Sequence, residues 1–517
     1  MDNIMCSDMR GIKKITMAGL SLLIMGSVAG CGASSAETAA EIVEHTLNVS
    51  NSQQKTDYTV KKQYPSIFVD QVGYKTTSDK SVVFCAKRLP EEYEIRDVNS
   101  GETVYTGQII KSVYNEEDDR YCAIGRFNDF DVEGDYYIYA DYIGESYSFS
   151  IADDVYDESF MDACRKYYLN RCGIAIAQHG ACHTAEAHLQ ESRDTALDVT
   201  GGWHMDEKAD RDALIGSRII ENLLFAYEIN SDVFGDEEGI SESGNDIPDI
   251  LDEVKYGADW LLKMQDERTG GVYAAALTEG ATEFFSAPVV VSSVSMDSTI
   301  NFAASMARFG YLYQKYDSEY ATKVLRAADR AWECFLNNQK ALDNSACFKA
   351  AAQLYRATGN AKYHKVLESF FAVDDFSESF NQDDNILLGA VTYLSTSQAV
   401  SKEQCDILIK LLMQKSEAIA KRAAESSFMV SASTEEGLDD FLSDMRCLTI
   451  TNHIIYNHEY TTIIENHLHY LRGMNPNGIN YVTDNTENTY LDEGKAGIMN
   501  DPQNTALMIF MMSVLPL

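Results

Sequence analysis

Four carboxylates lie close together between residues 198 and 210, beside a glycine pair and a tryptophan. The run reads Asp198-Val199-Thr200-Gly201-Gly202-Trp203-His204-Met205-Asp206-Glu207-Lys208-Ala209-Asp210. Hydrolysis of an acetal needs one carboxylate that activates water and a second acid that protonates the leaving oxygen. Acids near the start of a helix also interact favourably with its dipole, so this cluster alone leaves a catalytic and a structural role open.

Two cysteines and two histidines form a second group of candidate functional residues. Cys172, Cys182, His183 and His204 offer soft thiolate and imidazole ligands in the number that tetrahedral zinc prefers. The alternative is a pair of buried thiols beside two solvated histidines. The spacing of the four residues leaves both interpretations open.

Further short motifs follow one another over most of residues 66–483. They are Asp70-Gln71-Val72-Gly73-Tyr74 and residues 167–173, 179–183, 242–253, 260–265, 270–273, 473–476 and 481–483. Together with Gly201-Gly202-Trp203-His204, their order resembles that of glycoside hydrolase family 9, the cellulase and endoglucanase type. The resemblance implies an N-terminal immunoglobulin-like domain packed on an (α/α)6 barrel, whose open cleft binds β-1,4-linked glucan.

The resemblance also implies an inverting mechanism, in which an Asp of the tryptophan motif activates water and a distant Glu near the C-terminus acts as the acid. We assign water activation to Asp206 and Asp210, with Glu207 as a further candidate. The segment departs from the family pattern, because Glu207-Lys208-Ala209 separates the two aspartates where the family has Ala-Gly. A structural role for any one of the three acids stays open.

The C-terminal end departs further from the family pattern. After Tyr481-Val482-Thr483, neither the family's His-His-Arg segment nor its Asn-Glu pair is intact. Asn500-Asp501 lies nearest to the Asn-Glu position, although Asp is one methylene shorter than Glu. We expect Asp501 to be the acid in preference to Glu493, and the alternative is a chain that has no acid.

The metal content follows from the same resemblance. Relatives with the N-terminal sandwich often hold a structural zinc on a set such as Cys172, Cys182, His183 and His204. We therefore expect zinc beside the loop that leads to Asp206. Calcium is also common in the family, but the sequence assigns no ligands to it.

Aromatic side chains are the usual platforms for sugar rings, since the apolar face of a sugar stacks on a flat ring. Of the three tryptophans, Trp260 and Trp332 lie within helical apolar patterns and are expected in the core. We expect Trp203, with Tyr490, to contact the substrate. So few platforms favour short or soluble oligosaccharides over crystalline cellulose.

The elements that position these residues fall into two parts. Residues 64–153 contain short β-rich runs, such as 67–69, 81–84 and 136–139, which predict a small all-β sandwich of immunoglobulin-like size. From residue 154 to 517 the periodicity is helical and strand signals nearly vanish, which predicts a large all-α domain. The clearest helical runs are 212–228, 250–264, 298–316, 320–336, 463–471 and 506–514. The absence of a strict repeat disfavours a solenoid.

The N-terminus predicts export. Lys13 and Lys14 precede an apolar run from Ile15 to Val28, so residues 1–30 are interpreted as a signal peptide. The run ends at Cys31 after small residues, as in a bacterial lipobox, and we expect Cys31 to be the lipid anchor. An ordinary signal peptide is the alternative. Residues 31–63 are poor in large apolar residues and predict a disordered tether, which would hold the protein at the cell surface or in the periplasm.

Composition narrows the class of partner. The chain has 80 acidic and 42 basic residues and a formal net charge of -38, which disfavours nucleic acid and other polyanions. A neutral glucan or oligosaccharide suits this charge better, and we expect a monomer. Of the 11 cysteines, all but Cys6 and Cys31 lie in the predicted domains, and most are expected to be buried thiols.

Three functional hypotheses result. The first is an inverting hydrolase of β-1,4-linked glucans or oligosaccharides. The second is a non-catalytic lipoprotein that binds oligosaccharides and descends from such an enzyme, which the altered acid motifs suggest. The third is a purely structural surface protein, and it would require a helical domain without a concave polar pocket.

Overall fold

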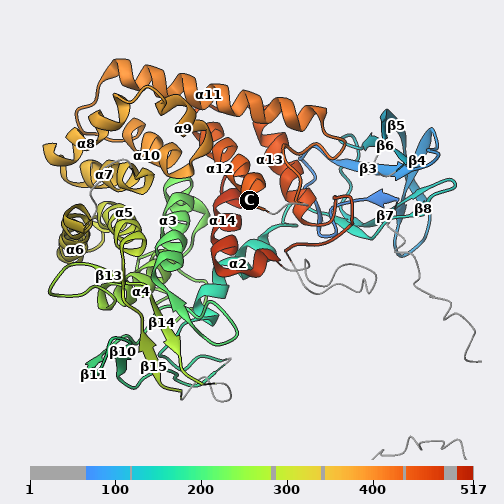
Figure 1. Cartoon of the computed structure of the whole chain (residues 1–517). Helices are drawn as coiled ribbons and strands as arrows, with labels where there is room; N and C mark the ends of the chain where they lie inside the picture. Colours follow the sequence, from blue (N-terminus) through green and yellow to red (C-terminus); the bar gives the residue numbers. More distant parts are fainter. Residues whose placement is uncertain are drawn as a thin grey trace, which may run out of the picture. The chain divides into compact units, whose positions relative to one another are not determined.

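The computed structural model describes residues 66–116, 119–177, 179–280, 287–338, 344–434, 438–482 and 498–515. Within them an N-terminal β domain precedes a large helical domain, as the sequence predicts (Figure 1). The expected signal segment 1–30, the anchor Cys31 and the tether 31–63 lie outside the described residues. In the part of the chain that is described, no helix combines the length and the apolar character needed to cross a bilayer.

The β domain is built from two layers that share one long strand. Its strands are β1 (Ile67–Phe68), β2 (Gly73–Tyr74), β3 (Ser81–Ala86), β4 (Glu92–Asp97), β5 (Thr103–Asn115), β6 (Arg120–Arg126), β7 (Gly134–Ala140), β8 (Gly144–Glu145) and β9 (Phe149–Ile151). Their order is β1-β3-β6-β5-β4-β7-β9-β2, with β8 beside β7. The first half of β5 pairs with β4 and its second half with β6, so β5 passes from one layer to the other.

Side chains of β3 alternate between two cores, because successive residues of a strand point to opposite faces. Val82 and Phe84 fill the interior of the sandwich, whereas Val83 and Cys85 belong to the core of the helical domain. Cys85 forms a disulfide with Cys122, its direct partner on β6. Most of the domain cysteines are buried thiols, as expected, but this pair is bonded. The sequence does not indicate the bond, because two residues 37 positions apart become neighbours only when the strands pair.

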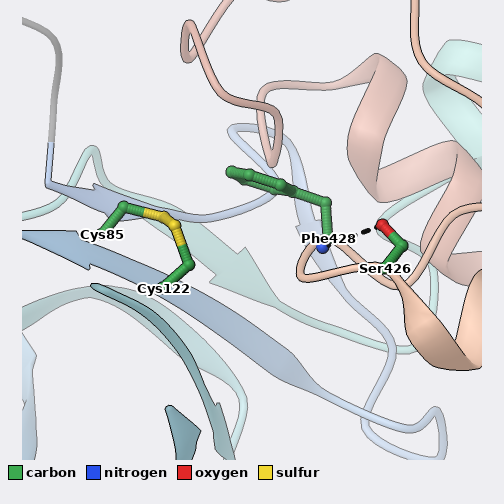
Figure 2. The surroundings of a disulfide bond; sticks show 4 residues. All are labelled: Cys85, Cys122, Ser426 and Phe428. Carbon is green, nitrogen blue, oxygen red and sulfur yellow. Dashed lines mark hydrogen bonds between the residues drawn. A yellow bond between two sulfur atoms is a disulfide. The ribbon is translucent and has the colours of Figure 1, made fainter. Parts of the chain in front are cut away.

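The disulfide lies where the sandwich meets a loop of the helical domain (Figure 2). Phe428 extends toward the sandwich, and its ring packs edge-on against Phe68 with centroids 5.5 Å apart. Its backbone N–H donates to Ser426 Oγ at 3.2 Å, which fixes the turn that carries the ring. The two domains thus share a continuous apolar contact.

The helical domain contains the predicted helical runs. Its helices are α2 (Asp157–Leu169), α3 (Ala213–Ile229), α4 (Asp249–Lys263), α5 (Met296–Tyr313), α6 (Ser318–Asn338), α7 (Ser345–Thr358), α8 (Ala361–Phe371), α9 (Phe376–Gln382), α10 (Asp384–Leu394), α11 (Lys402–Glu425), α12 (Asp439–Ile454), α13 (His458–Leu471) and α14 (Pro502–Met512), with short turns η1 (Ser231–Val233) and η3 (Ile498–Asn500).

Six of these helices pack in sequence around a common core. Helix α3 packs on α5, α5 on α7, α7 on α10, α12 on α14, and α14 on α3. Between α10 and α12, Ser443 Oγ donates to Asp384 Oδ1 at 2.7 Å. Helices α2, α4, α6 and α8 pack against α14, α3, α5 and α7, respectively. The helices of the first set are buried around much of their circumference, whereas α6 buries one face only.

The large domain is not purely helical, which corrects the all-α prediction. Strands β10 (Ala187–Leu189), β11 (Ser192–Leu197), β12 (Arg211–Asp212), β14 (Ala275–Thr278) and β15 (Val289–Val291) form a sheet, and β13 (Val272–Tyr273) pairs with β16 (Val294–Ser295). Strands of two to six residues are too short to leave a clear period in the sequence. This sheet matters because β12 leads directly into α3.

A buried contact between an aspartate and a histidine joins the two domains. Asp70 Oδ2 lies 2.8 Å from His469 Nδ1 of α13, and both side chains are fully buried. Asp70 Oδ1 accepts the backbone N–H groups of Val72 and Gly73 at 2.8 and 3.1 Å. The Asp-Gln-Val-Gly-Tyr motif therefore closes its own turn and holds the helical domain at the same time.

We predict that Asp70→Ala lowers the urea midpoint and melting temperature, because it leaves His469 buried without its partner. Removing one member of a buried pair costs about 3–5 kcal/mol. Lys87→Ala removes the exposed pair with Asp119 and is the control, which should melt like wild type. Equal melting of the Asp70 variant and wild type would show that the pair does not support the interface.

Candidate active site

Two segments, residues 170–172 and 202–204, run side by side at the centre of the site. Gly202 has φ +76°, and a Cβ there would lie 2.7 Å from the ring of Trp260, so only glycine fits. The carbonyl of Gly202 accepts the N–H of Cys172 at 2.8 Å, and the carbonyl of Asn170 accepts the N–H of His204 at 2.8 Å. These bonds bring the candidate metal ligands of both segments together.

Trp203 holds the loop of residues 198–210 against helix α4. Its side chain is 1% exposed, and its ring lies against Gly257, where a Cβ would come within 2.2 Å of it. Its indole N–H donates to Glu253 Oε2 at 3.2 Å. The expectation that Trp203 contacts the substrate is therefore wrong, since a ring enclosed on both faces has none to offer a sugar. Tyr490, the other expected platform, lies outside the described residues.

A buried charge network supports the tryptophan. Arg171 Nη2 forms a 2.8 Å ion pair with Glu253 Oε1, and Arg171 Nη1 lies 2.9 Å from Glu242 Oε1. Burial raises the pKa of Glu253 to about 7, against the opposing effect of Arg171. A neutral Glu253 is thus accessible near neutral pH, directly beneath the loop.

The expected water-activating residues lie above this support. Asp206 is exposed, and its Oδ1 accepts the N–H groups of Lys208 and Asp210 at 2.9 and 3.0 Å. Asp210 is half-buried, and its Oδ1 accepts the N–H of Thr278 at 2.7 Å. In each carboxylate one oxygen is fixed by the backbone, whereas Oδ2 makes no hydrogen bond within the described residues. Glu207 is exposed beside them.

Asp501 begins the last helix. It is exposed, and its Oδ1 accepts the N–H groups of Gln503 and Asn504 at 2.9 and 3.4 Å, as an N-cap does. The adjoining Pro502 carbonyl accepts the hydroxyl of Tyr167 at 2.5 Å. The other expected acid, Glu493, lies outside the described residues.

The two acidic segments lie at the same end of the helical domain. Asn230, which ends α3, donates to the carbonyl of Ser513, which ends α14, at 3.0 Å, so the two helices run parallel. Their starts therefore point the same way. Because α3 has 17 residues and α14 has 11, α14 begins about 9 Å deeper along the shared axis. Tyr167 connects the two starts, since its ring lies 5.4 Å from that of Trp203.

A polar pocket of about 350 Å³ opens at this end. Five helices line it, with Arg218, Glu221 and Asn222 from α3, Lys349 from α7, Asp384, Asn385 and Leu388 from α10, Asp439, Leu442, Ser443 and Arg446 from α12, and Gln503, Asn504 and Leu507 from α14. Beneath it, Lys349 Nζ contacts Glu221 Oε2 at 2.7 Å and Asn301 Oδ1 at 3.1 Å. The lining combines donors and acceptors, as recognition of hydroxyl groups requires.

Sequence reasoning missed this pocket because its residues lie between positions 218 and 507. A signal was present in two helices. Glu221 and Asn222 interrupt an otherwise apolar run in α3, and Lys349 does so in α7. A charge in the middle of a buried helix needs a partner, and here Lys349 and Glu221 pair with each other.

The four expected metal ligands are brought together. Their candidate ligand atoms lie within 4.8 Å of one another. Cys172 Sγ is 3.4 Å from His183 Nδ1, and Cys182 Sγ is 3.7 Å from Cys172 Sγ and 3.3 Å from His204 Nε2. The hydrogen bond from Cys172 is the largest influence that lowers the pKa of Cys182, and the two imidazoles act in the same direction.

These separations fit a tetrahedral metal ion. Zinc bonds of about 2.3 Å to sulfur and about 2.0 Å to nitrogen place neighbouring ligand atoms about 3.3–3.8 Å apart. A disulfide would need its sulfur atoms at about 2.05 Å, so Cys172 and Cys182 are separate thiols. The donor set, two thiolates and two imidazoles, is the one that soft tetrahedral ions prefer.

Comparison with known families assigns both domains. Residues 156–493 match the model of glycosyl hydrolase family 9, and residues 62–145 match that of the cellulase N-terminal immunoglobulin-like domain. A cellodextrinase from Butyrivibrio fibrisolvens is 27% identical over 473 residues, which cover 82% of this chain and 85% of that protein. Endoglucanase D from Acetivibrio thermocellus is 28% identical over 63% of this chain, which spans only 57% of that protein.

Solved structures share the fold. The crystal structure of a metagenome-derived glycoside hydrolase family 9 endoglucanase superposes with a TM-score of 0.76 at 21% identity. The match covers 86% of this chain and 98% of that chain. Both domains therefore have counterparts of known architecture.

The buried acids predict how stability depends on pH. Burial raises the pKa of Glu253 to about 7 and that of Asp252 to about 6. At these two groups the folded protein retains protons that the unfolded chain has lost, so their contribution to stability falls as pH rises from about 4.5 to about 7 and levels off above. Each such group contributes a slope of about 1.4 kcal/mol per pH unit within its window.

We expect Glu253→Gln to flatten the decline of melting temperature between pH 5 and 7, since the amide does not titrate. Asp252→Asn is the companion variant, and it should remove only the lower part of the decline. Melting curves recorded at intervals across this range test both. A decline in Glu253→Gln that runs parallel to that of wild type would contradict the assignment.

Proposed function

The chain belongs to glycosyl hydrolase family 9, and on that premise we propose that it hydrolyses β-1,4-linked glucans or oligosaccharides with inversion at the anomeric carbon. One observation carries the proposal. The 206–210 loop precedes α3 and Asp501 precedes α14, so their carboxyl groups lie at the same end of two parallel helices, and both helices contribute polar residues to one pocket. An inverting hydrolase needs two carboxyl groups on opposite sides of a sugar, about 6.5–9.5 Å apart.

Asp210 is our first choice for the group that activates water, with Asp206 beside it. The N–H of Thr278 orients one oxygen of Asp210 and leaves the other for a water molecule. Asp206 closes the loop through two backbone N–H groups, which supports an orienting role. Glu207 makes no such bonds among the described residues and is the least supported of the three.

For the proton donor we favour Glu493 over the expected Asp501. Two backbone N–H groups donate to Asp501 Oδ1, so this carboxyl group is engaged as the N-cap of α14. A general acid needs a carboxyl group that can approach the leaving oxygen of the substrate. Glu493 precedes α14 by only nine residues (493 to 502), close enough to reach the same pocket.

We further propose that the domain is an (α/α)6 barrel. Its inner helices would be α3, α5, α7, α10, α12 and α14, and its outer helices would include α2, α4, α6 and α8. In such a barrel the inner helices run parallel, and α3 and α14 do so. The pocket then occupies the mouth formed by the N-terminal ends of the inner helices. This arrangement supports substrate binding across the mouth.

Zinc is our proposal for the ion held by Cys172, Cys182, His183 and His204, in a structural role. When bound, it would hold the loop that carries Asp206 and Asp210, because His204 lies two residues before Asp206. Calcium stays a prediction without assigned ligands.

The preferred substrate is proposed to be a short or soluble oligosaccharide. No aromatic ring is among the described residues that line the pocket. Because aromatic rings are the usual platforms for sugar rings, this lining disfavours crystalline cellulose as the substrate. This chain matches 85% of the length of a cellodextrinase, and the name of that relative supports the same class of substrate.

We propose that the protein is exported and anchored through Cys31. The Cys85–Cys122 disulfide supports an oxidising compartment outside the cytosol. A monomeric state stays a prediction.

Turnover of cello-oligosaccharides and mixed-linkage glucan tests the proposed activity. Asp210→Asn should lower kcat about 10²–10⁴-fold, because the amide cannot accept the proton of the attacking water. Ligand titration should show that the variant still binds the oligosaccharide. Binding without turnover by folded wild type, in a metal-replete preparation, would favour the non-catalytic alternative.

Two isosteric variants separate the candidate acids. Glu493→Gln should abolish cleavage of natural substrates yet retain cleavage of aryl cellobiosides with acidic phenol leaving groups, which depart without protonation. Asp501→Asn should stay active on both classes, because asparagine still caps α14.

Asp501→Ala, which removes the cap, should cost about 0.5–2 kcal/mol of stability without the leaving-group dependence. The opposite pattern, with leaving-group dependence in Asp501→Asn and none in Glu493→Gln, would return the acid role to Asp501.

A further inference from the structure

Thr278, at the end of β14, contacts both halves of the site. Its backbone N–H donates to Asp210 Oδ1 at 2.7 Å. Its hydroxyl oxygen lies 3.3 Å from His183 Nε2. One residue therefore contacts the carboxylate proposed to activate water and a ligand of the proposed metal site.

The pairing of β14 explains why the backbone N–H of Thr278 is available to a side chain. β14 pairs with β12 through Arg211 with Ala276 and Asp212 with Ala275, and the pairing ends there. The N–H of Thr278, two residues further along, donates to the Asp210 carboxylate. On its other edge Thr278 pairs with Val289 of β15, which continues the sheet on that side.

The imidazole of His183 has a defined orientation. Its Nδ1 faces Cys172 Sγ at 3.4 Å, so Nδ1 is the nitrogen directed at the metal set. Nε2 is then the outer nitrogen, and in a neutral imidazole bound through Nδ1 it carries the hydrogen. His183 is buried, and its backbone has φ +46°, an unusual value for a residue with a side chain.

We propose that Thr278 is a positioning residue that couples occupancy of the metal site to the orientation of Asp210. The hydroxyl of Thr278 accepts the hydrogen of His183 Nε2, and its N–H fixes Asp210 Oδ1. A bound ion holds the imidazole, the imidazole holds Thr278, and Thr278 holds the carboxylate. The catalytic half of this inference rests on the proposed function of Asp210.

The coupling is reciprocal, as linkage requires. If the ion stabilises the bonded arrangement of Thr278 and Asp210, loss of that arrangement must weaken binding of the ion. Removal of a group that hydrogen-bonds a metal-ligating histidine typically lowers metal affinity or activity about 10–100-fold. Metal affinity therefore reports on Thr278 without any substrate.

The test compares Thr278→Val, which removes the hydroxyl and keeps the backbone, with Thr278→Ser, which keeps both groups. Zinc affinity is measured by competition with a chromogenic chelator. Thr278→Val should bind zinc about 10–100-fold more weakly, and Thr278→Ser should bind it like wild type. Thr103→Val is the matched control, because it removes a threonine hydroxyl bonded to Glu94 on the β domain. It should leave zinc affinity unchanged.

Kinetics on a soluble cello-oligosaccharide provide the second readout. Thr278→Val should lower kcat with little change in KM, because Asp210 loses orientation while the pocket is intact. Thr278→Ser should have the kcat of wild type, because it keeps both the hydroxyl and the backbone N–H. Circular dichroism and melting curves accompany each variant, and Thr278→Ala replaces the valine variant if valine prevents folding.

A double-mutant cycle tests the link itself. Asp210→Ala should weaken zinc binding in the wild-type background and have a smaller effect in Thr278→Val, since the shared contact is already lost. Additive effects, or wild-type zinc affinity in Thr278→Val, would overturn the inference. Absence of turnover in wild type would overturn the proposed function alone, because the zinc measurements need no substrate.

Discussion

The site depends on the burial of one indole ring beneath a loop. Trp203 fits against α4 because Gly257 has no side chain there, and its N–H is satisfied by Glu253. Glu253 can be buried because Arg171 lies 2.8 Å away, and Arg171 immediately precedes a metal-ligand candidate, Cys172. The same contacts therefore fix the loop, place Cys172 beside His204, and direct the chain toward Asp206 and Asp210.

Helix direction supplies the second constraint. Because α3 and α14 run parallel, residues that precede them meet at one end of the domain even though hundreds of positions separate them in sequence. The shorter α14 leaves a recess above its first turn, and the pocket lies in it. Residues from the first turns of α14 and from the middle of α3 both line this pocket. The difference in level between the two helix starts therefore gives the helical domain a concave polar surface.

Much of this could be predicted from the sequence, and the failures have physical reasons. The four candidate metal ligands are recognisable because their chemistry is distinctive and all of them lie in short motifs, residues 167–173, 179–183 and 201–204. Trp203 departs from its predicted role, since its residue type indicates an aromatic platform but its exposure depends on Gly257 and Glu253 of α4. The Cys85–Cys122 bond and the β10–β15 sheet depend on pairing between distant segments. The pocket is lined by residues of five helices, and no local pattern connects them.

The stereochemistry of the first product tests the central claim most directly. If a carboxylate of the 206–210 loop delivers water to the face opposite the leaving group, proton NMR of a fresh digest of a β-1,4-linked oligosaccharide must show the α-anomer before mutarotation. That is the result the account predicts. Initial appearance of the β-anomer would require a covalent intermediate and a second carboxyl group about 5–5.5 Å away, which would contradict it.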